Sequence, residues 1–208
     1  MPRAEPARGP GRPPSGARER VLQAGLDVLK AEGYAGLTTA KVAARSGQNK
    51  ALIGYHFGSK QGLVAAVGRE LAASITEEVV GGLERTETVA EIVGGVMDGL
   101  WRLMDRDERL ARLYFDLAAV SVVEPDVREV MREMKASWRN VTAGLLTAAS
   151  DGPPKRDAEA AGIYVLAGIE GLALERLDRG ETRSLARAMR MFVSSAADAL
   201  SARGSASA

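Results

Sequence analysis

The stretch from Leu37 to Lys60 decides the fold, and it reads LTTAKVAARSGQNKALIGYHFGSK. Its first part, residues 37–47, begins with hydroxyl side chains suited to capping a helix and ends in Gly47. A second short segment, residues 49–57, follows within two residues. Because a glycine relieves backbone strain where the chain reverses, the spacing predicts two short helices joined by a tight turn, a helix-turn-helix.

Apolar residues at helical intervals continue on both sides of this motif. Before it, the spacing predicts a helix from about Ala17 to Glu32 that stops at Gly33, and after it a longer helix over 61–81. Further helices are predicted, separated by ordinary turn compositions, over 88–105, 108–123, 126–150, 156–178 and 181–202. No strand pattern competes with them, so the fold class is all-α with about nine helices.

The net charge of +1 hides an asymmetry along the chain. Residues 1–60 contain ten Lys and Arg against four Asp and Glu, a net of +6, and the remainder carries a net of −5. A basic segment indicates an anionic partner, because neutralising phosphates releases their counterions. The Pro/Gly-rich basic arm, residues 1–15, has a composition typical of disorder, and its arginines offer an alternative role as minor-groove contacts.

Composition also excludes several classes of site. The chain has no Cys and one His, and it has neither a phosphate-cradling glycine loop nor a metal-ligand spacing. We therefore expect no catalytic residue, no bound metal and no cofactor. No export signal and no apolar run of about 20 residues is present, so we expect a soluble, cytoplasmic protein without a membrane partner.

Residues 18–71 resemble the DNA-binding domain of the TetR (tetracycline repressor) family. The resemblance is carried, in the family's order and spacing, by Gly33-Tyr34, Thr38-Thr39, Gly47, Tyr55-His56-Phe57 and Lys60. It implies a dimeric transcription regulator with a DNA-binding part and an effector-binding part. One departure is Gly54, because the family often carries a second Tyr at that position, and a glycine there costs about 1 kcal/mol of helix stability relative to Ala.

Seven residues are the candidate DNA contacts. Gln48, Asn49 and Lys50 stand at the amino-terminal end of the predicted recognition helix, where such side chains read base edges or reach phosphate. The resemblance implies phosphate contacts for Thr39 and Lys60, with Thr38 as the helix cap. Tyr55 and His56 match aromatic positions that touch the DNA backbone, and for His56 a phosphate contact and a packing role both stay open.

A small-molecule pocket is expected among the middle helices, where a bundle can leave an apolar cavity. The candidate lining residues are mostly bulky side chains, and one is an acid, Asp116, within an otherwise apolar run. They are Met97, Trp101, Met104, Phe115, Asp116, Met134, Trp138 and Tyr164, with Leu113, Tyr114 and Met131 beside them. Ordinary core packing is the alternative for each of them. A buried Asp116 would need a partner or a cationic or hydroxylated ligand, whereas a surface position would need neither.

The segment Gly168 to Leu174 is similar to part of the family's penultimate helix. By that resemblance the last two helices pair with those of a second subunit, and small residues would let the backbones approach. The candidate interface residues are Gly168, Gly171, Leu172 and Ala196.

These observations predict a DNA-binding domain over 16–76 with its motif at about 38–57, an effector and dimerisation domain over 77–203, and a tail over 204–208. The predicted function is a homodimeric repressor that leaves a palindromic operator in double-stranded DNA when a small effector binds. Two alternatives are an effector-independent architectural DNA-binding protein and a small helical enzyme.

Overall fold

The computed structural model describes residues 16–81, 83 and 88–201. They form eight α-helices and one short 3-10 helix, with no strand among them, which confirms the all-α prediction. The chain divides into two compact units between Val67 and Gly68, inside helix α4 (Lys60–Val80). The boundary predicted from the sequence, after residue 76, lies nine residues later. The predicted arm, 1–15, and the predicted tail, 204–208, lie outside the described residues.

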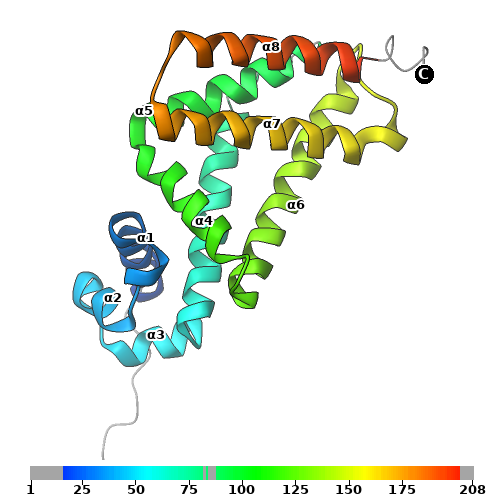
Figure 1. Cartoon of the computed structure of the whole chain (residues 1–208). Helices are drawn as coiled ribbons and strands as arrows, with labels where there is room; N and C mark the ends of the chain where they lie inside the picture. Colours follow the sequence, from blue (N-terminus) through cyan, green and yellow to red (C-terminus); the bar gives the residue numbers. More distant parts are fainter. Residues whose placement is uncertain (1–15, 82, 84–87, 202–208) are drawn as a thin grey trace, which may run out of the picture. The chain divides into compact units, whose positions relative to one another are not determined.

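Unit 1 consists of α1 (Ala17–Gly36), α2 (Thr39–Ser46), α3 (Lys50–Phe57) and the first turns of α4 (Figure 1). Its core is built from aliphatic side chains that are at most 4% exposed: Val21, Ala24, Val28, Leu29, Leu37, Val42, Ile53, Leu63, Val64 and Val67. α1 and α4 approach closely at Gly25, where a Cβ would lie 3.2 Å from the Leu63 side chain. The predicted stop of the first helix holds, because Gly33 leaves helical geometry at φ +68°.

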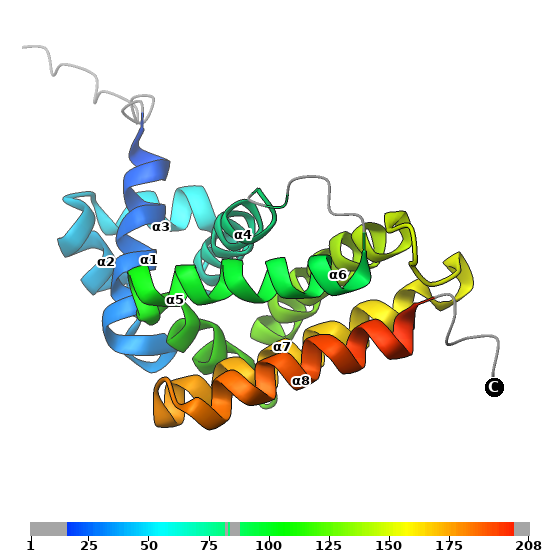
Figure 2. The same ribbon diagram turned by 90° about the horizontal axis from the view of Figure 1, so that it is seen from above.

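Unit 2 contains the rest of α4, α5 (Val89–Val120), α6 (Pro125–Ala148), the 3-10 turn η1 (Lys155–Asp157), α7 (Ala158–Arg179) and α8 (Arg183–Leu200). α6 packs along α7, α7 along α8, and α8 along α5. Figure 2 shows α7 and α8 running side by side. None of the helices within the described ranges combines the length and the apolar character needed to span a bilayer.

α5 replaces two predicted helices, 88–105 and 108–123. It begins with a capping box, in which Thr88 accepts from the Glu91 N–H and the Glu91 carboxylate accepts from the Thr88 N–H. The predicted break exists as a kink at Asp107 (φ −152°, ψ 83°), and helical geometry resumes directly after it. The polar sequence there therefore bends the helix without ending it.

Arg176, on α7, fastens the segment just before this kink. Its side chain is only 9% exposed, donates to the Trp101 carbonyl at 3.1 Å and forms ion pairs with Asp105 and Glu181. Its guanidinium also lies 5.3 Å from the centroid of the Trp101 ring. A buried cation needs such partners, so this cluster fixes α7 against α5.

Candidate nucleic-acid interface and ligand cavity

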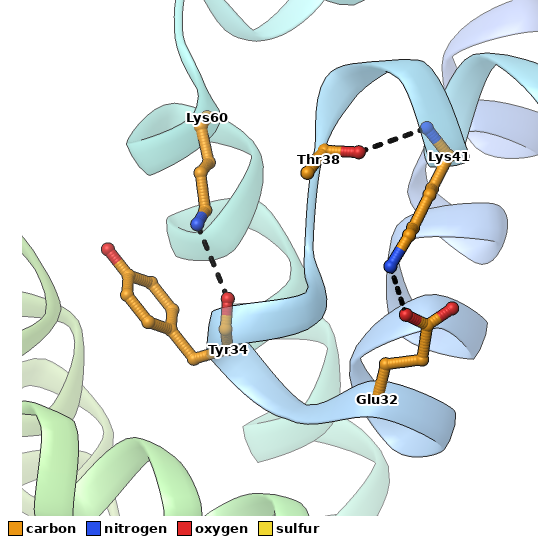
Figure 3. A network of polar contacts seen from close by, with 5 residues as sticks. All are labelled: Glu32, Tyr34, Thr38, Lys41 and Lys60. Atoms are coloured by element: carbon orange, nitrogen blue, oxygen red, sulfur yellow. Dashed lines mark hydrogen bonds and ion pairs between the residues drawn. The ribbon is translucent and has the colours of Figure 1, made fainter.

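The two short helices of the motif are defined by local caps. Thr38 caps α2 by accepting a hydrogen bond from the Lys41 N–H at 3.2 Å, as predicted (Figure 3). Gly47 ends α2 in the left-handed region at φ +65°. Asn49 caps α3, its side-chain oxygen accepting from the Ala51 N–H at 2.9 Å. The helix-turn-helix prediction is thereby confirmed in its two helices and its glycine turn.

The three candidate base-reading residues differ in how free they are. Lys50 is exposed on the first turn of α3. Gln48 is half-buried, and its amide donates back to the Ser46 carbonyl at 3.4 Å. The oxygen of Asn49 is occupied by the cap, so a base contact through that oxygen would compete with helix initiation. Lys50 is therefore the side chain best placed to reach DNA without breaking a local bond.

The two candidate phosphate contacts stand at helix starts. Thr39 is the first residue of α2, and Lys60 is the first residue of α4. The Lys60 ammonium donates to the Tyr34 backbone carbonyl at 3.3 Å and lies 4.3 Å from the centroid of the Tyr34 ring (Figure 3). Ser59 caps α4 by accepting from the Gly62 N–H at 3.0 Å. Lys60 thus connects the end of α1 to the start of α4. A DNA phosphate would have to compete with the Tyr34 carbonyl for its ammonium.

The aromatic pair on α3 divides between surface and interior. Tyr55 is 72% exposed. The His56 ring stacks edgewise, with centroids 5.1 Å from Tyr55 and 6.2 Å from Phe57. Its Nε2 is buried and has no hydrogen-bond partner within the described part of the chain. These contacts favour the packing role that the sequence left open for His56.

Sequence reasoning missed how the cations of α2 are used. Lys41 forms an ion pair with Glu32 (Figure 3), and Arg45 pairs with Asp27 at 3.2 Å, so both bind acids of α1. Nine and eighteen residues separate the partners, and only the chain reversal brings them together. Exposed pairs of this kind contribute about 0.2 to 1 kcal/mol each, so they orient α2 more than they stabilise it.

Two glycines of the motif lead to opposite predictions for the same substitution. A Cβ at Gly54 would meet nothing within 4 Å, so we expect Gly54→Ala to raise the free energy of unfolding of unit 1 by about 1 kcal/mol. Gly47→Ala should lower it by about 1 to 2 kcal/mol, because φ is +65° there. Urea denaturation of both variants measures the two shifts, and shifts of equal sign would contradict this interpretation.

Unit 2 contains two small, partly open cavities between its helices. The central cavity has a volume of about 70 Å³ and is lined by Ile75, Thr76, Val79, Val96, Leu100, Trp138, Val141, Thr142, Leu166 and Ile169. The aromatic cavity has a volume of about 50 Å³ and is lined by Ile75, Leu100, Leu103, Ala111, Tyr114, Phe115, Trp138, Ile169, Glu170 and Ala173. Four residues line both cavities, so the two are neighbours around Trp138.

Hydrogen bonds fix the polar groups around these cavities. The Trp138 indole N–H donates to the Thr76 hydroxyl at 3.0 Å, which in turn donates to the Ala72 carbonyl at 2.8 Å. The Tyr114 hydroxyl donates to Glu170, and the Lys135 ammonium pairs with the other carboxylate oxygen at 3.0 Å. Glu170 and Lys135 are not among the predicted site residues. Glu170 lies 56 residues from Tyr114 and 35 from Lys135, so the sequence does not show that the three side chains meet.

The Tyr114 hydroxyl gives a pH dependence. Burial, then the hydrogen bond to Glu170 and its charge, raises the pKa of Tyr114 above its ordinary value. The folded chain therefore keeps a proton that the unfolded chain releases near pH ~10, and stability falls above that pH by up to about 1.4 kcal/mol per unit. Between about pH 10 and 11, wild type should lose about 1 kcal/mol of unfolding free energy relative to Tyr114→Phe, which has no hydroxyl to titrate. Urea titrations of both proteins at each pH measure this change. A constant difference would contradict it.

The structure brings two of the eight main pocket candidates to these cavities, Phe115 and Trp138, and Tyr114, named beside them, also lines the aromatic cavity. Met104 is buried beside them in a cluster with Ala111 and Ala173. Asp116 is half-buried and lines neither cavity. The side chains that line the cavities are mostly aliphatic, which a search for bulky aromatic and Met residues does not find.

The other four predicted pocket residues lie elsewhere in unit 2. Met97 lines a groove between α5 and α8, and Met134 lines one between α4 and α6. Trp101 contacts Arg176, and Tyr164 lies on α7, 39% exposed, with its hydroxyl 3.1 Å from that of Ser195. Helical periodicity predicts which residues share one face of a helix, but not which neighbouring helix packs against that face.

The predicted dimer residues also divide. Gly171 is exposed, and a Cβ there would meet open space. A Cβ at Gly168 would lie 2.1 Å from the Phe192 ring, so this glycine lets α7 approach α8 of the same chain. Ala196 is fully buried within its own chain, and Leu172 is half-buried. The small residues therefore serve, in part, the packing inside one subunit.

Two family models match the chain. Residues 21–67 match the bacterial regulatory proteins of the tetR family, and residues 102–201 match the C-terminal part of the BetI-type transcriptional repressors. The first match covers α2, α3 and their turn, which are the elements that carry the candidate DNA contacts. The second covers the larger part of unit 2.

Individual proteins agree with these matches. The HTH-type transcriptional regulator BetI 2 of Chromohalobacter salexigens is 26% identical over 178 residues, covering 81% of this chain and 84% of the relative. BetI 1 of the same organism is 24% identical over 55% of this chain, and the match spans only 57% of that relative. A crystallised transcriptional regulator from Rhodococcus sp. Rha1 is 22% identical, with a TM-score of 0.72, over 88% of this chain and 97% of that one, and so shares the fold.

Proposed function

The chain belongs to the tetR family of bacterial regulatory proteins, and from this membership we propose that it is a dimeric repressor released from its operator by a small effector. It is a DNA-binding transcription regulator. The observation that carries the proposal is the pairing of a helix-turn-helix in unit 1 with apolar cavities in unit 2 that α4 helps to line. Its site of action would be the cytoplasm, where the operator lies.

The DNA-binding half is supported by what α3 exposes. An α-helix fits the major groove, and side chains at its amino-terminal end then meet base edges. Lys50 is exposed at that end of α3, and Tyr55, five residues further on, is also exposed. We propose that Lys50 reads the operator, that Gln48 and Asn49 assist it after leaving their local bonds, and that Thr39, Tyr55 and Lys60 hold the DNA backbone.

Dimerisation is supported by the outer face of α7. Ile163, Tyr164 and Leu174 are 46%, 39% and 52% exposed, and Gly171 lies between them with open space above it. On α8, Met191 is 63% exposed. A second copy that buries these side chains would remove apolar surface from water and present two recognition helices to a two-fold symmetric site. A palindromic operator follows from that symmetry.

The switch is supported by the continuity of α4. Ile75, Thr76 and Val79 of this helix line the central cavity, and the same helix begins at Lys60 in the DNA-binding unit. Ligand pockets commonly have volumes of about 300 Å³ or more, so an effector must push apart the helices around a cavity of about 70 Å³. A displaced α4 would change the state of the DNA-binding unit, with a coupling of about 1 to 3 kcal/mol.

The experiment is a fluorescence-anisotropy titration of the protein against its selected operator, repeated in the presence of a panel of small molecules. We expect at least one compound to weaken operator binding about 5- to 150-fold and to leave binding to random DNA less affected. Specific binding that no compound alters would contradict the effector half and favour the architectural alternative.

A further inference from the structure

We propose that the effector is an uncharged, mainly apolar molecule of about one ring, with a single hydrogen-bonding group held by the Thr142 hydroxyl. The inference rests on the proposed function, since it names the class of ligand that enters the cavities of unit 2. Three properties of these cavities carry it: their lack of an unpaired charge, one unpartnered hydroxyl, and their size.

The central cavity has no ionisable side chain among its lining residues. Its polar side chains are Thr76, Trp138 and Thr142, and the remaining lining is aliphatic. An ion placed there would lose its hydration without gaining a counter-charge, which is the most costly form of burial. The lining therefore selects against both cations and anions.

The aromatic cavity contains one acid, but its charge is already compensated. Glu170 accepts from the Tyr114 hydroxyl with one oxygen and pairs with Lys135 at 3.0 Å with the other. A cationic ligand would meet the positive charge of Lys135, and an anionic ligand would meet the carboxylate itself. Asp116, the acid that the sequence suggested for a cationic ligand, lines neither cavity.

Thr142 supplies the polar group that a ligand can use. It is only 5% exposed and lines the central cavity from α6. Its hydroxyl forms no hydrogen bond with any residue that the structure describes. The other hydroxyl of the cavity, that of Thr76, already accepts from Trp138 and donates to Ala72. A ligand with one donor or acceptor would pair with the Thr142 hydroxyl in an otherwise mainly aliphatic cavity.

Size limits the ligand further. The two cavities have volumes of about 70 and 50 Å³ and share Ile75, Leu100, Trp138 and Ile169 in their linings. Together they approach the roughly 150 Å³ of an engineered apolar cavity that binds benzene. A single ring fits after a modest outward movement of the helices, and that movement is what the proposed switch requires.

The test is isothermal titration calorimetry of the full-length protein with four one-ring probes: phenol, toluene, benzylammonium and benzoate. We expect phenol to bind about three- to tenfold more tightly than toluene, because its hydroxyl pairs with Thr142. The two charged probes should not bind measurably. In Thr142→Val the affinity for phenol should fall to that for toluene, while the affinity for toluene stays unchanged.

Thr147→Val is the matched control. Thr147 lies on the same helix, but its hydroxyl donates to the Ala143 carbonyl at 2.9 Å and it lines neither cavity. Its replacement should leave the preference for phenol intact. A preference that survives in Thr142→Val, or tighter binding of a charged probe, would overturn the inference.

The same probes separate this inference from the proposed function. If phenol binds as expected through Thr142 and operator affinity does not change, the ligand class stands and the proposed switch fails. If the operator is released only by charged compounds, the switch stands and the ligand class is overturned.

Discussion

Replacing Lys50 with alanine is expected to lower operator affinity by about 30-fold or more. Lys50 is the one predicted base-reading side chain that is exposed and is not tied into a local cap. A good contact to a base edge discriminates by about 1 to 3 kcal/mol, and a dimer loses two such contacts. Fluorescence anisotropy with the selected operator and with random DNA at one salt concentration measures the effect. Loss of affinity for the operator alone assigns a base contact.

Lys155→Ala provides the control for charge. Lys155 is exposed on η1 in unit 2, so its removal changes the net charge by the same amount without touching α3. The operator affinity of Lys155→Ala should match that of wild type within about twofold at physiological salt, because Lys155 belongs to unit 2 and not to the unit that contains the candidate DNA contacts. Equal losses in both variants would show that Lys50 acts only through general attraction. Circular dichroism confirms that both variants remain folded.

Gly99→Ala should destabilise unit 2 and weaken operator binding together. A Cβ at Gly99 would lie 2.9 Å from the Cα and 2.9 Å from the carbonyl oxygen of Val79, so the backbone of α4 must move away from α5. Overpacking of this kind costs about 1 to 3 kcal/mol. Because the displaced helix is the one that lines the central cavity, the variant should mimic the effector-bound form. Urea denaturation and anisotropy measure the two effects.

Gly94→Ala is the partner experiment on the same helix. Gly94 has open space within 4 Å of the added methyl group. Its replacement should stabilise α5 by up to about 1 kcal/mol and leave operator affinity unchanged. If both variants behaved alike, the close approach of α5 to Val79 would not control the state of α4.

Local chemistry explains why the DNA-binding motif was predictable. The cap at Thr38, the left-handed turn at Gly47 and the stop at Gly33 each depend on residues only a few positions apart. Such signals are readable in the sequence because the free backbone groups at a helix end are satisfied by residues close to them in the chain. The role of Asn49 as a cap was missed, because the same residue type also suits base recognition.

Long-range contacts explain why the ligand cavity was only partly predictable. Tyr114 and Glu170 lie 56 residues apart, and Trp138 and Thr76 lie 62 apart, yet each pair forms a hydrogen bond. Periodicity shows that Tyr164 and Trp138 lie on helices. It does not show that Tyr164 faces α8 and that Trp138 faces the cavity. Which face of a helix meets which neighbour is decided by packing between helices.

The same reason applies to the dimer residues. Glycine and alanine permit a close approach, but their presence does not say whether the approaching helix is in the same chain. Gly168 faces Phe192 of its own chain, whereas Gly171, one turn away, faces open space. Exposure therefore selects Gly171, with its exposed neighbours Ile163 and Leu174, as the part of α7 that a second subunit would cover.

Selection of DNA from a random duplex library by the full-length protein tests the central claim most directly, with the mass of the resulting complex measured by light scattering. The expected result is an inverted repeat whose half-sites are separated by about one helical turn or a multiple of it, bound by two copies of the chain. Enrichment of no sequence, or a complex with a single copy bound to one half-site, would contradict a symmetric dimer that reads DNA through α3.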